Sequence, residues 1–126
     1  MQITGMYEDV LTLLLQIAKD SFPSEFLAEL SHTNGIIDDI LIIPGTITNQ
    51  VSAFIRNDTR PLILNLAGTA HSHPNGVLAP SATDTMNFAK LGGTCHIIIG
   101  PPFTRDSWKA FHSDGTARTL AIVQHK

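Results

Sequence analysis

The order in which helical and extended segments follow one another limits this chain to a layered fold. From Thr4 to Phe22, apolar residues recur at the spacing of a helix with a broad buried face, and Pro23 stops the pattern. Glu25 to Ser31 and Ile36 to Ile43 then predict two strands, because β-branched side chains fill the second and the turn-forming Thr33-Asn34-Gly35 lies between them. The first third of the chain is therefore expected to be a helix followed by a β-hairpin.

The segment between this hairpin and His71 is less regular. Val51 to Ile55 predicts a short strand, whereas Arg60 to Leu66 is compatible with either a strand or a helix. An apolar run from Leu62 to Thr69 leads into His71. We expect extended chain on the approach to this histidine.

The second half of the chain repeats the alternation of helix and strand. Gly76 and the flanking prolines predict a loop from Asn75 to Pro80, after which Ser81 begins a helix that ends near Leu91, before Gly92-Gly93. Three more strands are expected: Cys95 to Gly100, Ser107 to His112 and Thr116 to Gln124, the last two joined by a Ser113-Asp114-Gly115 turn. This order indicates one α/β or α+β domain over residues 1–126, with a mixed sheet.

Composition and charge narrow the classes of function. The chain has 126 residues, 43% apolar and 15% charged, which suits a compact core rather than disorder. Its net charge is -3 and its eight Lys and Arg form no run, so we expect no nucleic-acid partner. The apolar stretch Val10 to Ala18 is too short to span a membrane and follows two acids. With Cys95 as the single cysteine, a cytoplasmic location is expected.

The stretch His71-Ser72-His73-Pro74, followed six residues later by Ser81-x-x-Asp84, carries the strongest chemical signal. Residues two apart on a strand project from one face, so both histidines can aim at one point, and Pro74 ends the strand beside them. A loop and a new helix can return the chain so that Asp84 adds a carboxylate oxygen. Two histidines and one carboxylate leave a fourth tetrahedral position for water, which is typical of catalytic zinc.

Hydrolysis at such a site also needs a general base. A carboxylate that accepts a proton from water and later delivers it to the leaving amine serves both steps of amide cleavage. Glu25 is a candidate, although spacing alone does not place it near the metal.

Glu25 together with His71-Ser72-His73-Pro74-x6-Ser81-x2-Asp84 resembles the complete JAMM (MPN+) signature, E…H(S/T)HP…SxxD. The order of elements along nearly the whole chain is also similar to that of small archaeal and bacterial JAMM proteins. The resemblance implies that the residues at His71, His73 and Asp84 hold one Zn²⁺ per chain. It further implies that the residue at Glu25 is the general acid/base and that the one at Ser81 donates a hydrogen bond to the oxyanion.

The resemblance also implies a fold and a substrate. The fold would be a curved mixed sheet flanked by helices, similar to that of cytidine deaminases. The activity would be a zinc-dependent isopeptidase or peptidase that cuts after the C-terminal Gly-Gly of a ubiquitin-like protein, with that protein or its conjugate as partner. At 126 residues the chain has no room for the insertions with which large eukaryotic members grip ubiquitin chains, so linkage-specific deubiquitination is not implied.

Other interpretations stay open for the parts of this motif. An HxH pair can be an ordinary partly exposed pair, Ser81-x-x-Asp84 can be a helix start, and Glu25 alone can be a solvated acid at a strand edge. Ser72 is excluded as a nucleophile, because a residue between two strand histidines points to the opposite face. The histidines at positions 32, 96, 112 and 125 are expected to be structural or surface residues.

Three alternative functions follow from the same residues. A metal-free MPN scaffold would lack the ligands that are present here. A RadC-like protein associated with DNA repair carries a similar HxHP motif, but this chain has no basic cluster and no added helix-hairpin-helix region. An amidohydrolase for a small molecule would need the same metal site, so the motif alone leaves that alternative open.

Overall fold

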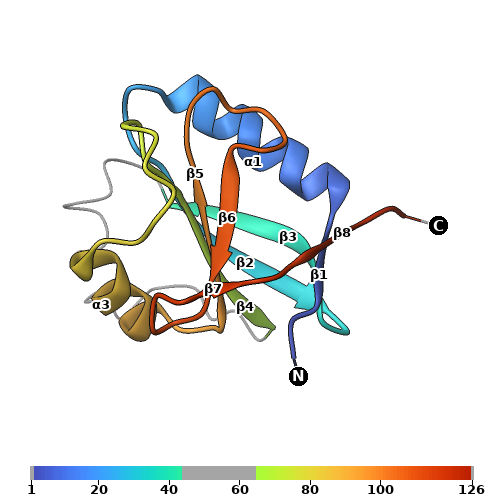
Figure 1. The fold of residues 1–126 in the computed structure, drawn as a ribbon. Helices are drawn as coiled ribbons and strands as arrows, with labels where there is room; N and C mark the ends of the chain where they lie inside the picture. The colour runs from blue at the N-terminus through green and yellow to red at the C-terminus, as the bar shows by residue number, and fades with distance from the viewer. Residues whose placement is uncertain (1, 44–64, 126) are drawn as a thin grey trace.

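A computed structural model describes residues 2–43 and 65–125 of the chain (Figure 1). Within these ranges the chain forms eight strands and two helices. In chain order they are β1 Gly5–Tyr7, α1 Glu8–Ser21, β2 Leu27–Thr33, β3 Ile36–Ile43, β4 Leu66–Ser72, α3 Ala82–Leu91, β5 Cys95–Ile99, β6 Trp108–Phe111, β7 Ala117–Arg118 and β8 Ala121–Val123.

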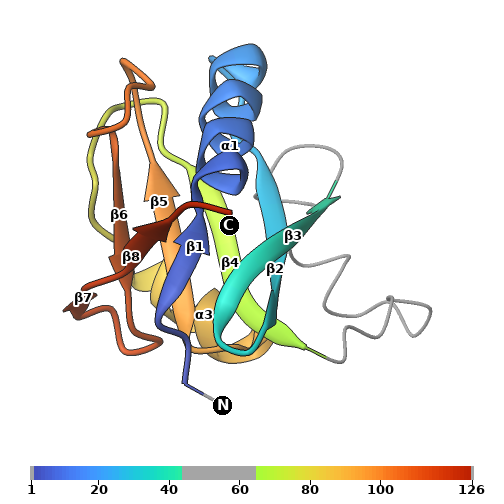
Figure 2. The same cartoon turned by 90° about the vertical axis from the view of Figure 1, so that its right-hand side faces the viewer.

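All eight strands belong to one mixed, curled sheet with the order β7-β6-β5-β4-β2-β3-β1-β8 (Figures 1 and 2). The pairs β4–β5, β1–β3 and β1–β8 are parallel, and the other four pairs are antiparallel. The expected α+β fold with a curved mixed sheet and flanking helices is confirmed. Within this order β4 lies between β2 and β5, so both edges of the strand that carries the histidine motif are paired.

The helices lie on opposite faces of the sheet, as alternate residues of β5 show. Ile97 and Ile99 belong to the larger core cluster under α1, whereas Ile98 packs with Phe88 of α3. Figure 2 shows the two helices on the two sides of the sheet. The buried side of α1 consists of the apolar residues that gave the helical spacing in the sequence, namely Val10, Leu11, Leu14, Leu15 and Ala18. In the described part of the chain no helix is long and apolar enough to cross a membrane.

The predicted hairpin is confirmed as β2 and β3. Asn34 and Gly35 adopt φ angles of 52° and 84°, and a side chain at Gly35 would meet the carbonyl oxygen of Gln2 at 2.5 Å. Glycine is therefore required in this turn. The Nδ1 atom of His32 accepts a hydrogen bond from the Gly35 amide at 3.0 Å, which agrees with a structural role for this histidine.

The prediction for the N-terminus is wrong, because the helix expected from Thr4 begins at Glu8. Gly5 to Tyr7 form β1 instead, with Gly5 and Met6 paired to the start of β3 on one side and all three residues paired to β8 on the other. These pairings with distant segments override the local periodicity.

The prediction for the C-terminus is also wrong, because the single strand expected from Thr116 to Gln124 is two short strands. β7 pairs with β6 at one edge of the sheet, whereas β8 pairs with β1 at the other. Between them Leu120 packs against the main core. The helix after Ser81 and its end at Gly92 are as predicted. The strand expected at Val51 to Ile55 and most of the ambiguous stretch Arg60 to Leu66 lie outside the described residues.

Candidate metal centre

The first histidine of the motif is held rigidly by the sheet. His71 lies near the end of β4, opposite Leu27 of β2 and next to Ile98 of β5, and it is 2% exposed. Its side chain points to the face that α3 covers, where it lines a small apolar hollow together with Leu27 and Phe88. A strand paired on both sides leaves the His71 backbone little freedom, so the imidazole has a fixed direction.

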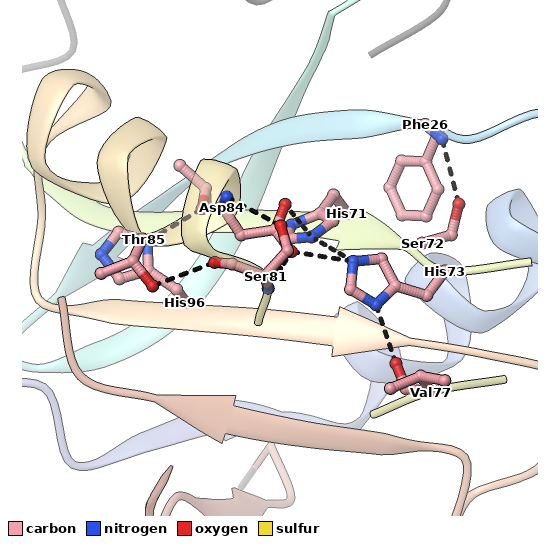
Figure 3. A network of polar contacts seen from close by, with 10 residues as sticks. Phe26, His71, Ser72, His73, Val77, Ser81, Asp84, Thr85 and His96 are labelled. Atoms are coloured by element: carbon pink, nitrogen blue, oxygen red, sulfur yellow. Dashed lines mark hydrogen bonds and ion pairs between the residues drawn. The ribbon is translucent and has the colours of Figure 1, made fainter. Parts of the chain in front are cut away.

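The second histidine follows the end of β4 and is oriented by a tight turn. The His73 amide still donates to Ile99 at 2.8 Å, and its carbonyl accepts from Gly76 at 2.9 Å. Its Nδ1 atom is 2.8 Å from the carbonyl oxygen of Val77 (Figure 3). The Val77 amide in turn donates to Asn75 Oδ1 at 3.0 Å. Because Nδ1 must donate its proton to that carbonyl, the neutral ring presents the lone pair of Nε2.

The carboxylate is supplied by the first turn of α3 through a capping box. Ser81 is the N-cap, and its Oγ accepts a hydrogen bond from the Asp84 amide at 3.1 Å. The Oδ2 atom of Asp84 accepts the Ser81 amide at 2.8 Å in return. The cap therefore fixes the direction of the Asp84 side chain as well as the start of the helix.

The three side chains converge on one point (Figure 3). The Nε2 atoms of His71 and His73 are 3.1 Å apart, and they lie 3.3 Å and 3.0 Å from the two carboxylate oxygens of Asp84. The candidate ligand atoms all fall within 4.8 Å of one another. Two imidazole nitrogens facing each other across a carboxylate need a proton or a cation between them, and nitrogen and carboxylate donors are a set that zinc takes. The residues therefore fit a divalent metal.

The electrostatics of the site also favour positive charge. Although burial opposes ionisation, hydrogen bonds from His71 and His73 hold the pKa of Asp84 well below its ordinary value. The hydrogen bond to Asp84 raises the pKa of His73 above its ordinary value in spite of burial, and the charge of Glu25 acts in the same direction. His73 and Asp84 remain 14% and 12% exposed, so solvent reaches this side of the site.

The two residues with predicted catalytic roles, Glu25 and Ser81, belong to segments next to the candidate ligands. Glu25 is half-buried and stands two residues before β2, within electrostatic reach of His73. The next residue, Phe26, donates its amide hydrogen to the side chain of Ser72, which stands between the two histidines in the sequence (Figure 3). Ser81 is exposed and adjoins Asp84, and the oxygen that caps the helix can still donate its own proton.

Sequence reasoning missed a buried layer behind His71. The ring of His96 stacks on Phe88 with centroids 4.1 Å apart, and Phe88 lies 6.1 Å from the ring of His71. Nδ1 of His96 is 2.9 Å from Thr69 Oγ1, and its Nε2 is 3.0 Å from Ser113 Oγ. Burial lowers the pKa of His96 to about 4, so the ring is neutral and structural. The only signal in the sequence was that Thr69 and His71 are two apart on one strand face.

The comparisons with known proteins agree with this geometry. Residues 8–111 match the family of prokaryotic homologs of the JAB domain. A "probable metalloprotease" of Haloferax volcanii is 36% identical, with 97% of this chain and 81% of that protein covered.

Two solved structures share the fold over nearly their whole length. A JAB1/MPN domain protein from Archaeoglobus fulgidus has a TM-score of 0.78 and 28% identity, covering 95% of this chain and 99% of its own. A structure described as "JAMM: a metalloprotease-like zinc site in the proteasome and signalosome" has a TM-score of 0.75 and 26% identity, covering 97% and 99%. The chain belongs to the prokaryotic JAB-domain family, and its His71, His73 and Asp84 form a candidate metal site of JAMM type.

Proposed function

We propose that the protein is a zinc-dependent peptidase that hydrolyses the peptide or isopeptide bond after the C-terminal Gly-Gly of a ubiquitin-like protein. The observation that carries this proposal is the convergence of two imidazole nitrogens and a carboxylate on one point that solvent reaches. His71, His73 and Asp84 would hold the zinc ion. When bound there, zinc acts as a Lewis acid and lowers the pKa of water towards about 7.

Two side chains of the protein carry the proton and the developing charge. Glu25 accepts the proton of the attacking water and returns it to the nitrogen of the leaving amine, so that one carboxylate serves both steps. Ser81 donates a hydrogen bond to the oxyanion that forms on the substrate carbonyl. The half-buried position of Glu25, within electrostatic reach of His73, supports the first role, and the place of Ser81 beside Asp84 supports the second.

A protein tail is supported as the substrate by the surroundings of the centre. Val77, whose carbonyl oxygen is 2.8 Å from His73 Nδ1, is 52% exposed. An apolar side chain exposed next to a candidate ligand suits contact with a protein tail. The JAMM resemblance supplies the expectation of a ubiquitin-like partner, and only glycine lets an extended backbone pass a narrow channel.

The test uses the purified, zinc-loaded protein with three kinds of substrate: a modifier joined to lysine by an isopeptide bond, the same modifier as a linear fusion, and short acyl amides. We expect release of the modifier, inhibition by a chelator, and a loss of about 100-fold or more in kcat for Glu25→Gln. Glu8→Gln is the matched control, because Glu8 is the first residue of α1, whereas Glu25 follows the end of that helix. Glu8 forms an ion pair with Arg105 at 2.9 Å. Robust cleavage by Glu25→Gln would contradict the mechanism, and hydrolysis of the short amides alone would show that the substrate is not a protein tail.

A further inference from the structure

Ser72 lies between the two histidines of the motif, but its side chain does not point at the metal centre. It is 2% exposed and alternates with His71 along β4, so it faces the opposite side of the sheet. There its Oγ accepts the amide of Phe26 at 3.0 Å (Figure 3). Ser72 is therefore neither a ligand nor a nucleophile, and its hydroxyl contacts the segment that leads into β2.

The pairing between this segment and β4 departs from a regular ladder. Beyond the Leu27–His71 pair, Phe26 and Ser72 stand opposite each other. In a regular antiparallel ladder the residues of a hydrogen-bonded pair exchange two backbone hydrogen bonds, and those of the alternating pairs exchange none. The Ser72 amide donates to the Phe26 carbonyl at 3.3 Å, but the Phe26 amide donates to the Ser72 side chain. The side chain thus takes the place of a backbone carbonyl and sets the distance between the two segments.

The hydrogen bond between Phe26 and Ser72 connects the segment of Glu25 to the segment of His73. Glu25 precedes Phe26 directly, and His73 follows Ser72 directly. On its other side Glu25 is restrained by the end of α1, where the Ser24 amide donates to Ser21 at 2.8 Å. A displacement of Phe26 relative to Ser72 therefore moves the carboxylate of Glu25 relative to the ligand His73.

We propose that Ser72 is a positioning residue, whose hydroxyl holds the Phe26 amide and thereby places the Glu25 carboxylate beside the metal centre. The expected effect on kcat rests on the proposed function. The hydrogen bond between the Ser72 hydroxyl and the Phe26 amide does not depend on that function. A buried amide that loses its acceptor must find another partner, so the segment shifts. Since a misplacement of about 1 Å can cost about 100-fold in rate, a change of at least about tenfold in kcat is expected.

The experiment compares Ser72→Ala with the matched pair Ser72→Thr and Ser72→Val. Threonine and valine have the same shape, but only threonine keeps the hydroxyl. Four quantities are measured in each zinc-loaded variant: the zinc content, the hydrogen-exchange rate of the Phe26 amide, and kcat and KM with a modifier conjugate. We expect unchanged zinc, faster Phe26 exchange, and kcat lowered at least about tenfold at constant KM in the Ala and Val variants, with Thr close to wild type.

Several results would overturn the proposal. Wild-type kcat in Ser72→Ala, equal kcat in the Thr and Val variants, or loss of zinc from Ser72→Ala would each show that the hydroxyl does not act by placing Glu25. If Ser72→Ala does not fold, the Thr and Val variants decide the question. If wild-type protein cleaves no substrate, the proposed function fails, and the exchange rate of Phe26 still tests whether Ser72 holds this segment.

Discussion

Ser81 combines a structural and a proposed catalytic role, and substitutions at this position can separate the two. Its Oγ accepts the Asp84 amide at 3.1 Å, and its own amide donates to Asp84 Oδ2 at 2.8 Å. Ser81→Ala removes the first of these bonds, which we expect to cost about 1 kcal/mol of stability. For a domain of this size the melting temperature should fall by roughly 3–5 °C. Loss of an oxyanion donor should separately lower kcat by about 100-fold or more.

Two further variants distinguish the role of Ser81 as the N-cap of α3 from its proposed role as a hydrogen-bond donor to the oxyanion. Ser81→Thr keeps both the acceptor oxygen and the hydroxyl proton, so stability and kcat should stay near wild type. Ser81→Asp keeps the acceptor at a helix start that favours negative charge, but an ionised carboxylate has no proton to donate. The Ser81→Asp variant should therefore have the melting temperature of the wild type and a lower kcat. Thermal unfolding and single-substrate kinetics on the same zinc-loaded preparations measure both quantities.

Ser81 does not have two separate roles if stability and kcat change together in all of these variants. Wild-type kcat in Ser81→Ala or Ser81→Asp would refute the oxyanion role. An unchanged melting temperature in Ser81→Ala would refute the cap, because α3 would then not depend on this hydrogen bond.

Three other substitutions test the sheet, the turn and the buried layer. A side chain at Gly68 would meet the carbonyl oxygen of Cys95 at 1.7 Å. Gly68→Ala should therefore lower the free energy of unfolding, measured with urea, by more than about 3 kcal/mol. A loss below about 1 kcal/mol would show that β4 and β5 do not approach so closely. Asn75→Ala removes the acceptor that holds Val77, and zinc affinity should fall about tenfold in a competition titration with a chelator; an unchanged Kd would contradict the role of this turn. Burial lowers the pKa of His96 to about 4, whereas the unfolded chain has a pKa of about 6.5. The unfolded state therefore binds more protons at this group between these values, and the contribution of His96 to stability should fall by about 2 kcal/mol from pH 7 to pH 5. Urea unfolding of the metal-free protein should show less of this loss in His96→Gln, and equal losses in both proteins would contradict the assignment.

The parts of the site that local chemistry determines could be predicted from the sequence. The two-residue period of a strand predicted His71 and His73 on one face; His73 lies one residue past the end of β4, but its amide still pairs with β5. The N-cap pattern at Ser81 placed Asp84 in the first turn of a helix. The hairpin followed from its turn residues in the same way. In each case the residues that determine the geometry are neighbours in sequence.

The parts that depend on distant pairing could not be predicted. Gly5 to Tyr7 are extended because β3 and β8 pair with them. Neither pairing can be recognised from the spacing of apolar residues in this part of the sequence. The position of Glu25 depends on the hydrogen bond between Phe26 and Ser72, which are 46 residues apart. The resemblance to a family gave Glu25 a role, but its location relative to His73 required the structure.

His71, His73 and Asp84 are proposed to bind one zinc ion together. The zinc content of the protein, measured by elemental analysis after dialysis against zinc and then against metal-free buffer, tests this proposal. We expect one zinc per chain in the wild type and less than about a tenth of that in His71→Ala, His73→Ala and Asp84→Ala, because removal of one ligand from a three-ligand site leaves too few donors. A wild-type protein that retains no zinc, or variants that retain as much as the wild type, would contradict it.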